Sequence, residues 1–204
     1  MDRVFADFTK VEHAPIKVPN PVDQAYNVAV RHIAGICNPN GWDEFSTFAE
    51  APTTLAELTA YANEHGRLGI ATEDSDGTIF DCADTNVHLR AWHDSVHLRH
   101  QLGFTVAGEA AAVYVQVAQV YHLYGFNEQT VRWAQLLLAD ILGLVINFKK
   151  TGRYPMNKRN GCVNEAKRWK YVAEQIWRYA QGKYHESGAL AYAKSEWGCY
   201  KEVV

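Results

Sequence analysis

The amino-acid sequence predicts a mainly helical domain with one small β-hairpin. Three observations support this prediction. Apolar residues recur at helical spacing in several long segments, capping residues or glycines stand at the ends of these segments, and one pair of short apolar runs flanks an Asp-Gly turn. The chain has 204 residues, 48% of them hydrophobic and 21% charged, which suits a single domain with a sizeable core.

Six segments are expected to be helical. Thr53 or Thr54 caps the second of them and Gly66 ends it, and the others show similar signals. The predicted helices span residues 23–37, 53–65, 86–100, 104–124, 127–148 and 164–183. In the segment 67–80, two apolar runs flank "EDSDG", so this segment is predicted to form the hairpin.

The sequence divides into three parts. Residues 1–22 contain three prolines and are expected to form an extended arm. Residues 23–150 should form a helical core that includes the hairpin. Residues 151–204 should form a basic, aromatic helical region that packs on this core. No internal repeat or low-complexity tract is present.

Charge is distributed unevenly along the chain, although the formal net charge is only −3. Residues 149–183 contain ten basic residues and two acidic ones. This segment could attract the acidic first half of the chain, remain solvated, or bind a phosphate-bearing or nucleic-acid partner. Its interleaved aromatic residues could stack on single-stranded nucleic acid, pack on the core, or form a contact in a homo-oligomer.

The N-terminal residues and the cysteines predict a cytoplasmic protein. The first ten residues, "MDRVFADFTK", lack the basic and apolar regions of a signal peptide. The four cysteines form no CxxC pair, so we expect free thiols in a reducing compartment. Polar residues interrupt the apolar segment 104–126, which therefore predicts a buried helix rather than a membrane span, and no membrane partner is expected.

The stretch "RAWHDSVHLRH" contains the strongest candidate site. His93 and His97 lie one helical turn apart and can direct two imidazoles at one metal ion. His100 falls on the same face, one turn further along. Arg90 and Asp94 form a second pair at this spacing and could hold one another in place.

Two carboxylates on apolar segments strengthen the metal hypothesis. Glu109 is the only formally charged residue between 104 and 126, and a buried carboxylate is costly without a compensating cation. Asp140 lies on the equally apolar segment 127–148. We predict that Glu109 is the third ligand, and that Asp140 is a fourth ligand or orients a ligating imidazole. The residues expected around these ligands are Arg90, His100 and Asn147. The expected ion is zinc, with iron or manganese as alternatives.

The segment His93–His97 resembles the zincin motif H-E-x-x-H, with aspartate in place of glutamate. The order helix, hairpin, HxxxH helix and Glu-bearing helix over residues 53–120 also resembles a minimal zincin. The resemblance implies that His93, His97 and Glu109 bind zinc and that Asp94 stands at the general-base position of a metal-dependent hydrolase. The stretch "NVHLRAWHD" also resembles uncharacterised tailed-phage proteins, which would place a bacteriophage-encoded protein in the host cytoplasm.

Other interpretations remain open. HD-type phosphohydrolases, to which the His-Asp pair is similar, would use His65, His93, Asp94 and Asp140 on nucleotides, which suits the basic segment. A non-catalytic interaction protein could be stabilised by a fully ligated metal. A ferritin-like site is disfavoured because the sequence has no repeated Glu-x-x-His pairs. No Gly-rich phosphate-binding motif indicates a nucleotide cofactor.

Overall fold

The computed structural model describes residues 23–154, 157–181 and 185–198 and confirms a mainly helical fold. The predicted arm, residues 1–22, lies outside the described residues. The α-helices are α2 (Gln24–Cys37), α3 (Leu55–His65), α4 (Ala83–His100), α5 (Val106–Tyr124), α6 (Glu128–Leu138), α7 (Leu144–Thr151), α8 (Lys158–Ala166), α9 (Lys170–Tyr179) and α10 (His185–Trp197). The strands are β1 (Trp42–Phe45) and β2 (Leu68–Ala71).

The predicted hairpin at 67–80 is wrong. β2 pairs with β1 in parallel, with Trp42 opposite Leu68 and Phe45 opposite Ala71, and α3 connects the two strands. All four residues of β2 are buried, a pattern typical of a parallel strand covered on both faces. Gly77 does have the positive φ of a turn residue, but its turn lies in the loop that leads to α4.

The second apolar run of the expected hairpin serves the core instead. Ile79 and Phe80 are buried in the main hydrophobic cluster, and Phe80 stacks on Tyr26 of α2. A short apolar run between turn residues fits either a strand or a buried loop. The choice here depends on contacts with a helix more than fifty residues earlier in the chain, which local sequence does not reveal.

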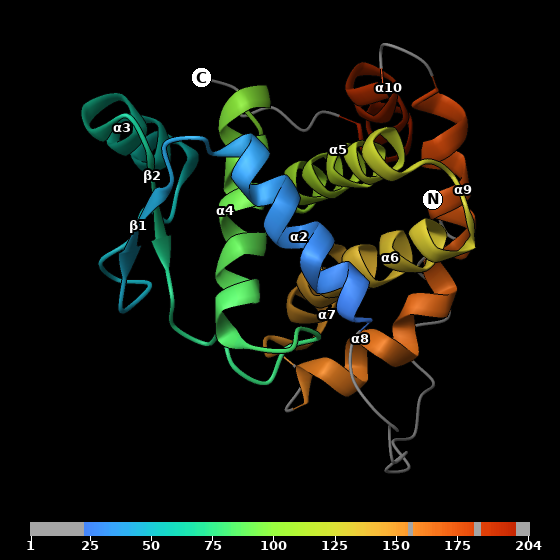
Figure 1. The fold of residues 1–204 in the computed structure, drawn as a ribbon, viewed down its shortest axis with the longest axis horizontal. Coiled ribbons are helices and arrows are strands. Elements are labelled where there is room, and N and C mark those ends of the chain that lie inside the picture. The colour runs from blue at the N-terminus through green and yellow to red at the C-terminus, as the bar shows by residue number, and fades with distance from the viewer. Residues whose placement is uncertain (1–22, 155–156, 182–184, 199–204) are drawn as a thin grey trace.

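Helix α4 lies at the centre of the fold. In Figure 1 the sheet and α3 lie on one side of α4, while α5, α6, α9 and α10 lie on the other. α4 contributes Trp92 and Val96 to the main hydrophobic cluster and Val87 and Ala91 to a smaller cluster beneath the sheet. Because both of its sides are packed, α4 has little freedom to move or turn, which makes it a rigid support for side chains at its surface.

The helix-end signals in the sequence are confirmed where they are local. Thr54 and Glu57 form a reciprocal capping box at the start of α3, and Gly66 ends that helix in a left-handed conformation. The long helices predicted at 127–148 and 164–183 are each divided. A π-helical turn, Ala139–Gly143, separates α6 from α7, and a 3-10 turn, Lys167–Trp169, separates α8 from α9.

The C-terminal helices pack directly on α5. Residues of α9 and α10 belong to the main cluster, among them Ile176 and Tyr192. Glu186 of α10 also binds polar groups of two helices: it accepts a hydrogen bond from Gln119 of α5 at 2.6 Å, and it pairs with Arg99 and His100 of α4 at 3.1 Å each. The division of the chain at residue 150 stays a prediction, because these contacts do not show separate domains.

We expect Glu186→Gln to lower the free energy of unfolding by about 1–2 kcal/mol, since it weakens charge-assisted hydrogen bonds between three helices. The hydrogen bond from His100 outweighs burial and lowers the pKa of Glu186 to about 2. The loss of unfolding free energy caused by Glu186→Gln should therefore become smaller only below pH 4.5, the ordinary pKa of a glutamate. In that range the wild-type carboxylate itself becomes protonated. Urea denaturation at pH 7 and pH 3 checks this, and an equal loss at both values would contradict it.

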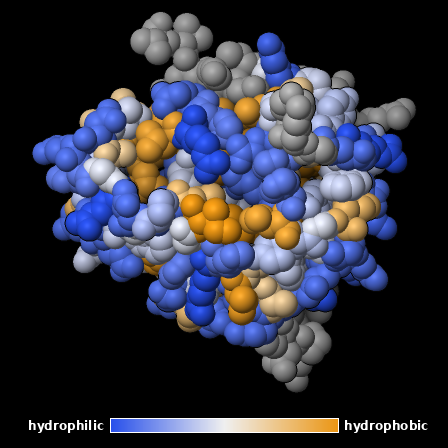
Figure 2. Space-filling model, turned by 45° about the horizontal axis from the view of Figure 1, so that its top comes forward, coloured by the Kyte–Doolittle hydropathy of each residue, from blue (hydrophilic) through white to orange (hydrophobic). Residues whose placement is uncertain are grey.

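One helical stretch among the described residues, Glu128–Thr151, is long and apolar enough to cross a membrane by length and composition alone. Half of its most apolar window is buried in the fold, and the core helix of a soluble protein meets the same criteria. The segment singled out in the sequence, 104–126, forms the largely buried α5. On the face shown in Figure 2, apolar side chains form separate areas among polar ones. Scattered apolar residues of this kind define no binding site by themselves.

Candidate metal centre

A tight turn between α4 and α5 brings the candidate ligands together. Gln101 ends α4 in a left-handed conformation with φ 54°, and Thr105 caps α5 by accepting a hydrogen bond from the Gly108 amide. A Cβ atom on Gly108 would overlap the carbonyl group of Gly103. Only glycine permits this close approach, which places Glu109, in the first turn of α5, against α4.

His93, His97 and Glu109 form a group that could hold a metal ion, with their ligand atoms all within 4.8 Å of one another. The two Nε2 atoms are 2.9 Å apart, His93 Nε2 is 3.0 Å from Glu109 Oε2, and His97 Nε2 is 3.7 Å from Glu109 Oε1. Ligand atoms around a tetrahedral zinc ion, each ~2.1 Å from it, lie roughly 3.4 Å apart. The three side chains are therefore close to the spacing that zinc requires.

The other imidazole nitrogens determine which atoms face the site. His97 Nδ1 lies 2.8 Å from the carbonyl oxygen of Leu102, which can only accept, so Nδ1 carries the proton. His93 Nδ1 lies 2.9 Å from Gln116 Oε1 and donates to it. Each Nε2 therefore directs a lone pair into the site. Because two lone pairs repel one another at 2.9 Å, a proton or a metal ion must lie between them.

The same arrangement shifts the ionisation of the group. Burial alone would lower the pKa of His93, but the Glu109 carboxylate outweighs it and raises this pKa to about 9. Burial would raise the pKa of Glu109, and the His93 imidazolium outweighs it and lowers that pKa well below 4.5. The start of a helix also favours a carboxylate, because its free N–H groups carry partial positive charge. In the metal-free protein, the proton on His93 therefore supplies the positive charge that a metal ion would otherwise bring to the site.

Zinc binding should therefore strengthen with pH. An ion must displace the His93 proton, so below pH 9 the apparent affinity should rise by roughly tenfold per pH unit. Calorimetric titration with zinc at pH 6, 7 and 8 measures this slope, and a flat profile would contradict it. For the metal-free protein, the raised His93 pKa stabilises the fold below pH 6.5, and this contribution is lost as pH rises through about 9. The lowered Glu109 pKa contributes above pH 4.5 and is lost in acid.

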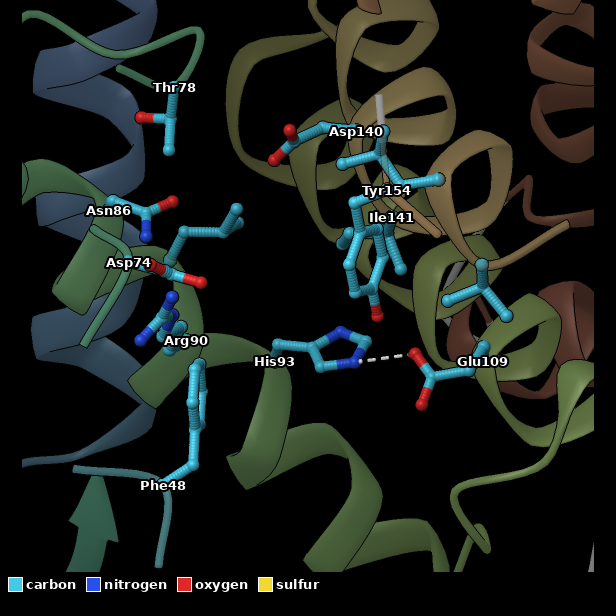
Figure 3. A pocket seen from close by; sticks show the side chains of 13 residues that line it. Phe48, Asp74, Thr78, Asn86, Arg90, His93, Glu109, Asp140, Ile141 and Tyr154 are labelled. Atoms are coloured by element: carbon cyan, nitrogen blue, oxygen red, sulfur yellow. Dashed lines mark hydrogen bonds and ion pairs between the residues drawn. The ribbon is translucent and has the colours of Figure 1, made fainter. Parts of the chain in front are cut away.

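A cavity of about 280 Å³ opens beside the group (Figure 3). His93 and Glu109 form one part of its wall, and Tyr154 directs its hydroxyl toward them. The nearby Glu109 charge contributes, after burial, to a raised Tyr154 pKa. The remaining lining residues are Phe48, Asp74, Thr78, Asn86, Leu89, Arg90, Asp140, Ile141, Leu144 and Val145. The cavity could admit a small molecule or a side chain directly to a metal ion.

Arg90 anchors the wall opposite Glu109. Its Nη1 donates to the carbonyl oxygens of Ala71 and Glu73 at 2.6 and 2.7 Å, and its guanidinium lies 5.0 Å from the centre of the Phe48 ring. Burial, partly offset by the Asp94 charge, lowers the pKa of Arg90. Arg90 therefore fastens α4 to the loop after β2, and it does so through main-chain oxygens rather than the expected bond to Asp94.

Asp94, the expected general base, does not line the cavity, although Arg90 and His93 on the same helix do. Around the helix axis Asp94 lies about 100° from His93 and about 40° from Arg90, so it is on the same side of α4 as Arg90 without being part of the cavity wall. Burial raises the pKa of Asp94, while the neighbouring histidines oppose that rise. Its charge contributes, after that of Glu109, to the raised pKa of His93.

The other predicted residues are not gathered at the ligand group. Asp140 lines the same cavity from the π-helical turn, where it accepts a 3.4 Å hydrogen bond from Cys162, but it is not among the three clustered ligands. His100 pairs with Glu186, and Asn147 donates to the carbonyl oxygen of Arg153. The π-helical turn helps to direct Asp140 and Ile141 toward the cavity.

The four residues of an HD-type site do not form one ligand group, although His93 and Asp140 line the same cavity. His65 lies at the end of α3. The centre of its ring is 4.2 Å from that of Tyr61, and its Nε2 is 3.9 Å from Glu64 Oε2. Within the described ranges, the group of potential ligands contains His93 but neither His65 nor Asp140.

Comparison with protein-family models, with curated proteins and with solved structures gave no match in any of the three. The resemblance to zincins therefore depends on the HxxxH segment and on Glu109. The expected zincin-like hairpin is replaced by a parallel strand pair.

Proposed function

We propose that His93, His97 and Glu109 bind a divalent ion, with zinc preferred, and that the protein is a metal-dependent hydrolase. One observation carries the proposal: the buried imidazole of His97 and the partly buried imidazole of His93 direct their Nε2 lone pairs at the same point, beside a carboxylate on a separate helix. Two nitrogens and one carboxylate are a ligand set typical of catalytic zinc, which keeps a further position for water or substrate.

The cavity supports a catalytic rather than a purely structural ion. Structural zinc sites are normally closed by four protein ligands, whereas the described residues offer three at this site, and two of them line a cavity. A bound zinc ion would supply Lewis acidity, which lowers the pKa of a water molecule and polarises a carbonyl or phosphoryl oxygen. Gln116 and Leu102 would fix the imidazole tautomers, and Tyr154 would present a hydroxyl to the substrate.

Of the two aspartates, Asp140 rather than Asp94 is the better candidate to accept a proton from water, because it lines the cavity. Asp140→Asn should therefore lower hydrolytic turnover more than Asp94→Asn does, while both variants keep their zinc. The reverse order would show that Asp94 acts as the zincin resemblance implies.

A cobalt-substituted protein tests the open position without knowledge of the substrate. If a ligand position is open, azide should bind to the cobalt and change its visible absorption. An unchanged spectrum, with one cobalt bound, would favour the alternative of a metal-stabilised, non-catalytic interaction protein. Zinc-loaded protein should also hydrolyse at least one member of a panel of peptides, esters and nucleotides, and Glu109→Gln or a chelator should abolish this activity.

A further inference from the structure

Three tyrosine rings form a continuous stack from the core to the surface. Tyr114 of α5 stacks on Tyr192 of α10 with ring centres 5.2 Å apart, and Tyr192 stacks on Tyr179 of α9 at 4.8 Å. Tyr114 and Tyr192 are buried, whereas Tyr179 is 51% exposed. The stack therefore ends in an exposed ring whose orientation is fixed from behind by two buried rings.

Basic residues occupy the exposed surface of the same helix. Lys170 and Arg178 of α9 are exposed, as are Lys167 just before the helix and Tyr171 within it. Lys167, Tyr171 and Arg178 share one face because they follow helical spacing, whereas Lys170 lies on the side of the helix opposite Tyr179. Glu174 pairs with Lys170 at 3.8 Å, while Lys167 and Arg178 form no ion pair with any other described residue.

The remaining aromatic residues near α9 serve packing. Trp169 is buried, and Trp177 stacks on Phe126 with ring centres 4.9 Å apart and contacts Tyr121 edge-on. The structure thus separates two groups of aromatic residues that the sequence leaves mixed. Only Tyr171 and Tyr179 of the α9 aromatic residues are exposed beside the basic residues.

We propose that the exposed face of α9 formed by Lys167, Tyr171 and Arg178, with Tyr179 at its edge, binds single-stranded nucleic acid. An unpaired base would extend the tyrosine stack by one ring, and the adjacent phosphates would be neutralised by Arg178 and Lys167. Stacking on a fixed aromatic ring is tolerant of base sequence, and phosphate contacts add affinity without sequence preference. A duplex suits the face less well, because its bases are already stacked. The proposal does not depend on the metal centre.

Fluorescence anisotropy with a labelled 12-nucleotide oligothymidylate, at low and moderate salt, tests the proposal. Binding should weaken with salt, with a slope of about −1.4 for two phosphate contacts. Tyr179→Ala should weaken binding roughly tenfold with the slope unchanged, and Tyr179→Phe, which keeps the ring, should bind like the wild type. Arg178→Gln should instead make the slope shallower by roughly 0.7. Together, the Tyr179 and Arg178 variants distinguish the contribution of base stacking to affinity from that of the phosphate contacts.

Phe148→Ala is the matched control, since Phe148 is also an exposed aromatic residue beside two lysines but lies on α7. It should leave binding unchanged. No binding at 50 mM salt, an equal loss for Phe148→Ala, or tighter binding to phosphatidylserine vesicles than to the oligonucleotide would each overturn the proposal. So would conversion of a wild-type dimer to a monomer by Tyr179→Ala. If Tyr179→Ala does not fold, the salt slope of Arg178→Gln tests the proposal instead, and a slope equal to that of the wild type would overturn it.

Discussion

His97→Ala is expected to lower zinc affinity by more than about 100-fold, because even the loss of a partner that only orients a ligand costs roughly 10–100-fold. His97 is fully buried and provides one of two Nε2 atoms that face the site. Competition with a chromophoric chelator measures the affinity. The same variant should lose the rise in thermal stability that zinc gives the wild type, since an ion that binds only the folded state stabilises it.

His100→Ala is the matched control for this experiment. His100 lies on the same helix, within one turn of His97, but it pairs with Glu186 of α10 rather than with the ligand group. It should keep wild-type zinc affinity and lose only stability. Equal loss of zinc in both variants would mean that the ion does not bind at His97.

Gly108→Ala is expected to destabilise the fold by about 3 kcal/mol or more, because the added Cβ overlaps the main chain of Gly103 and the backbone must shift. The shift moves the first turn of α5, which carries Glu109, away from α4. Zinc affinity should therefore fall as well, although the substituted residue is not itself a ligand. Urea denaturation and chelator competition measure the two effects separately.

Gly35→Ala provides the comparison, since a Cβ at that position in α2 meets no atom within 4 Å. There alanine should be neutral or stabilising by up to about 1 kcal/mol, because it restricts the unfolded chain and favours the helix. If Gly108→Ala behaved like Gly35→Ala, the close approach of α5 to α4 would not position Glu109.

The sequence predicted the features that depend on neighbouring residues. The capping box of α3 and the left-handed Gly66 are satisfied within one turn of helix. The cluster of His93, His97 and Glu109 was also accessible, because helical spacing aligns the histidines and a charge on an apolar helix needs a partner. Because α4 ends and the next helix begins a few residues later, Glu109 can lie beside the two histidines.

Features that depend on distant contacts were missed. The partner of β2 lies before α3, so the parallel pair could not be recognised from the turn-like segment after β2. The carbonyl of Leu102 and the amide of Gln116, which fix the tautomers, have no sequence motif, although Gln116 lies two helical turns after Glu109 on the same face of α5. Tyr154 belongs to the cavity because α7 ends just before it, which no local pattern near the histidines indicates.

Elemental analysis of the purified full chain, after dialysis against zinc and then against metal-free buffer, tests the central claim most directly. We expect about one zinc per chain, and about none in His97→Ala treated in the same way. Removal of the zinc by a chelator should lower the melting temperature of the wild type alone. Less than about 0.2 equivalent of any transition metal in the wild type, with a melting temperature that a chelator does not change, would contradict a metal site at His93, His97 and Glu109.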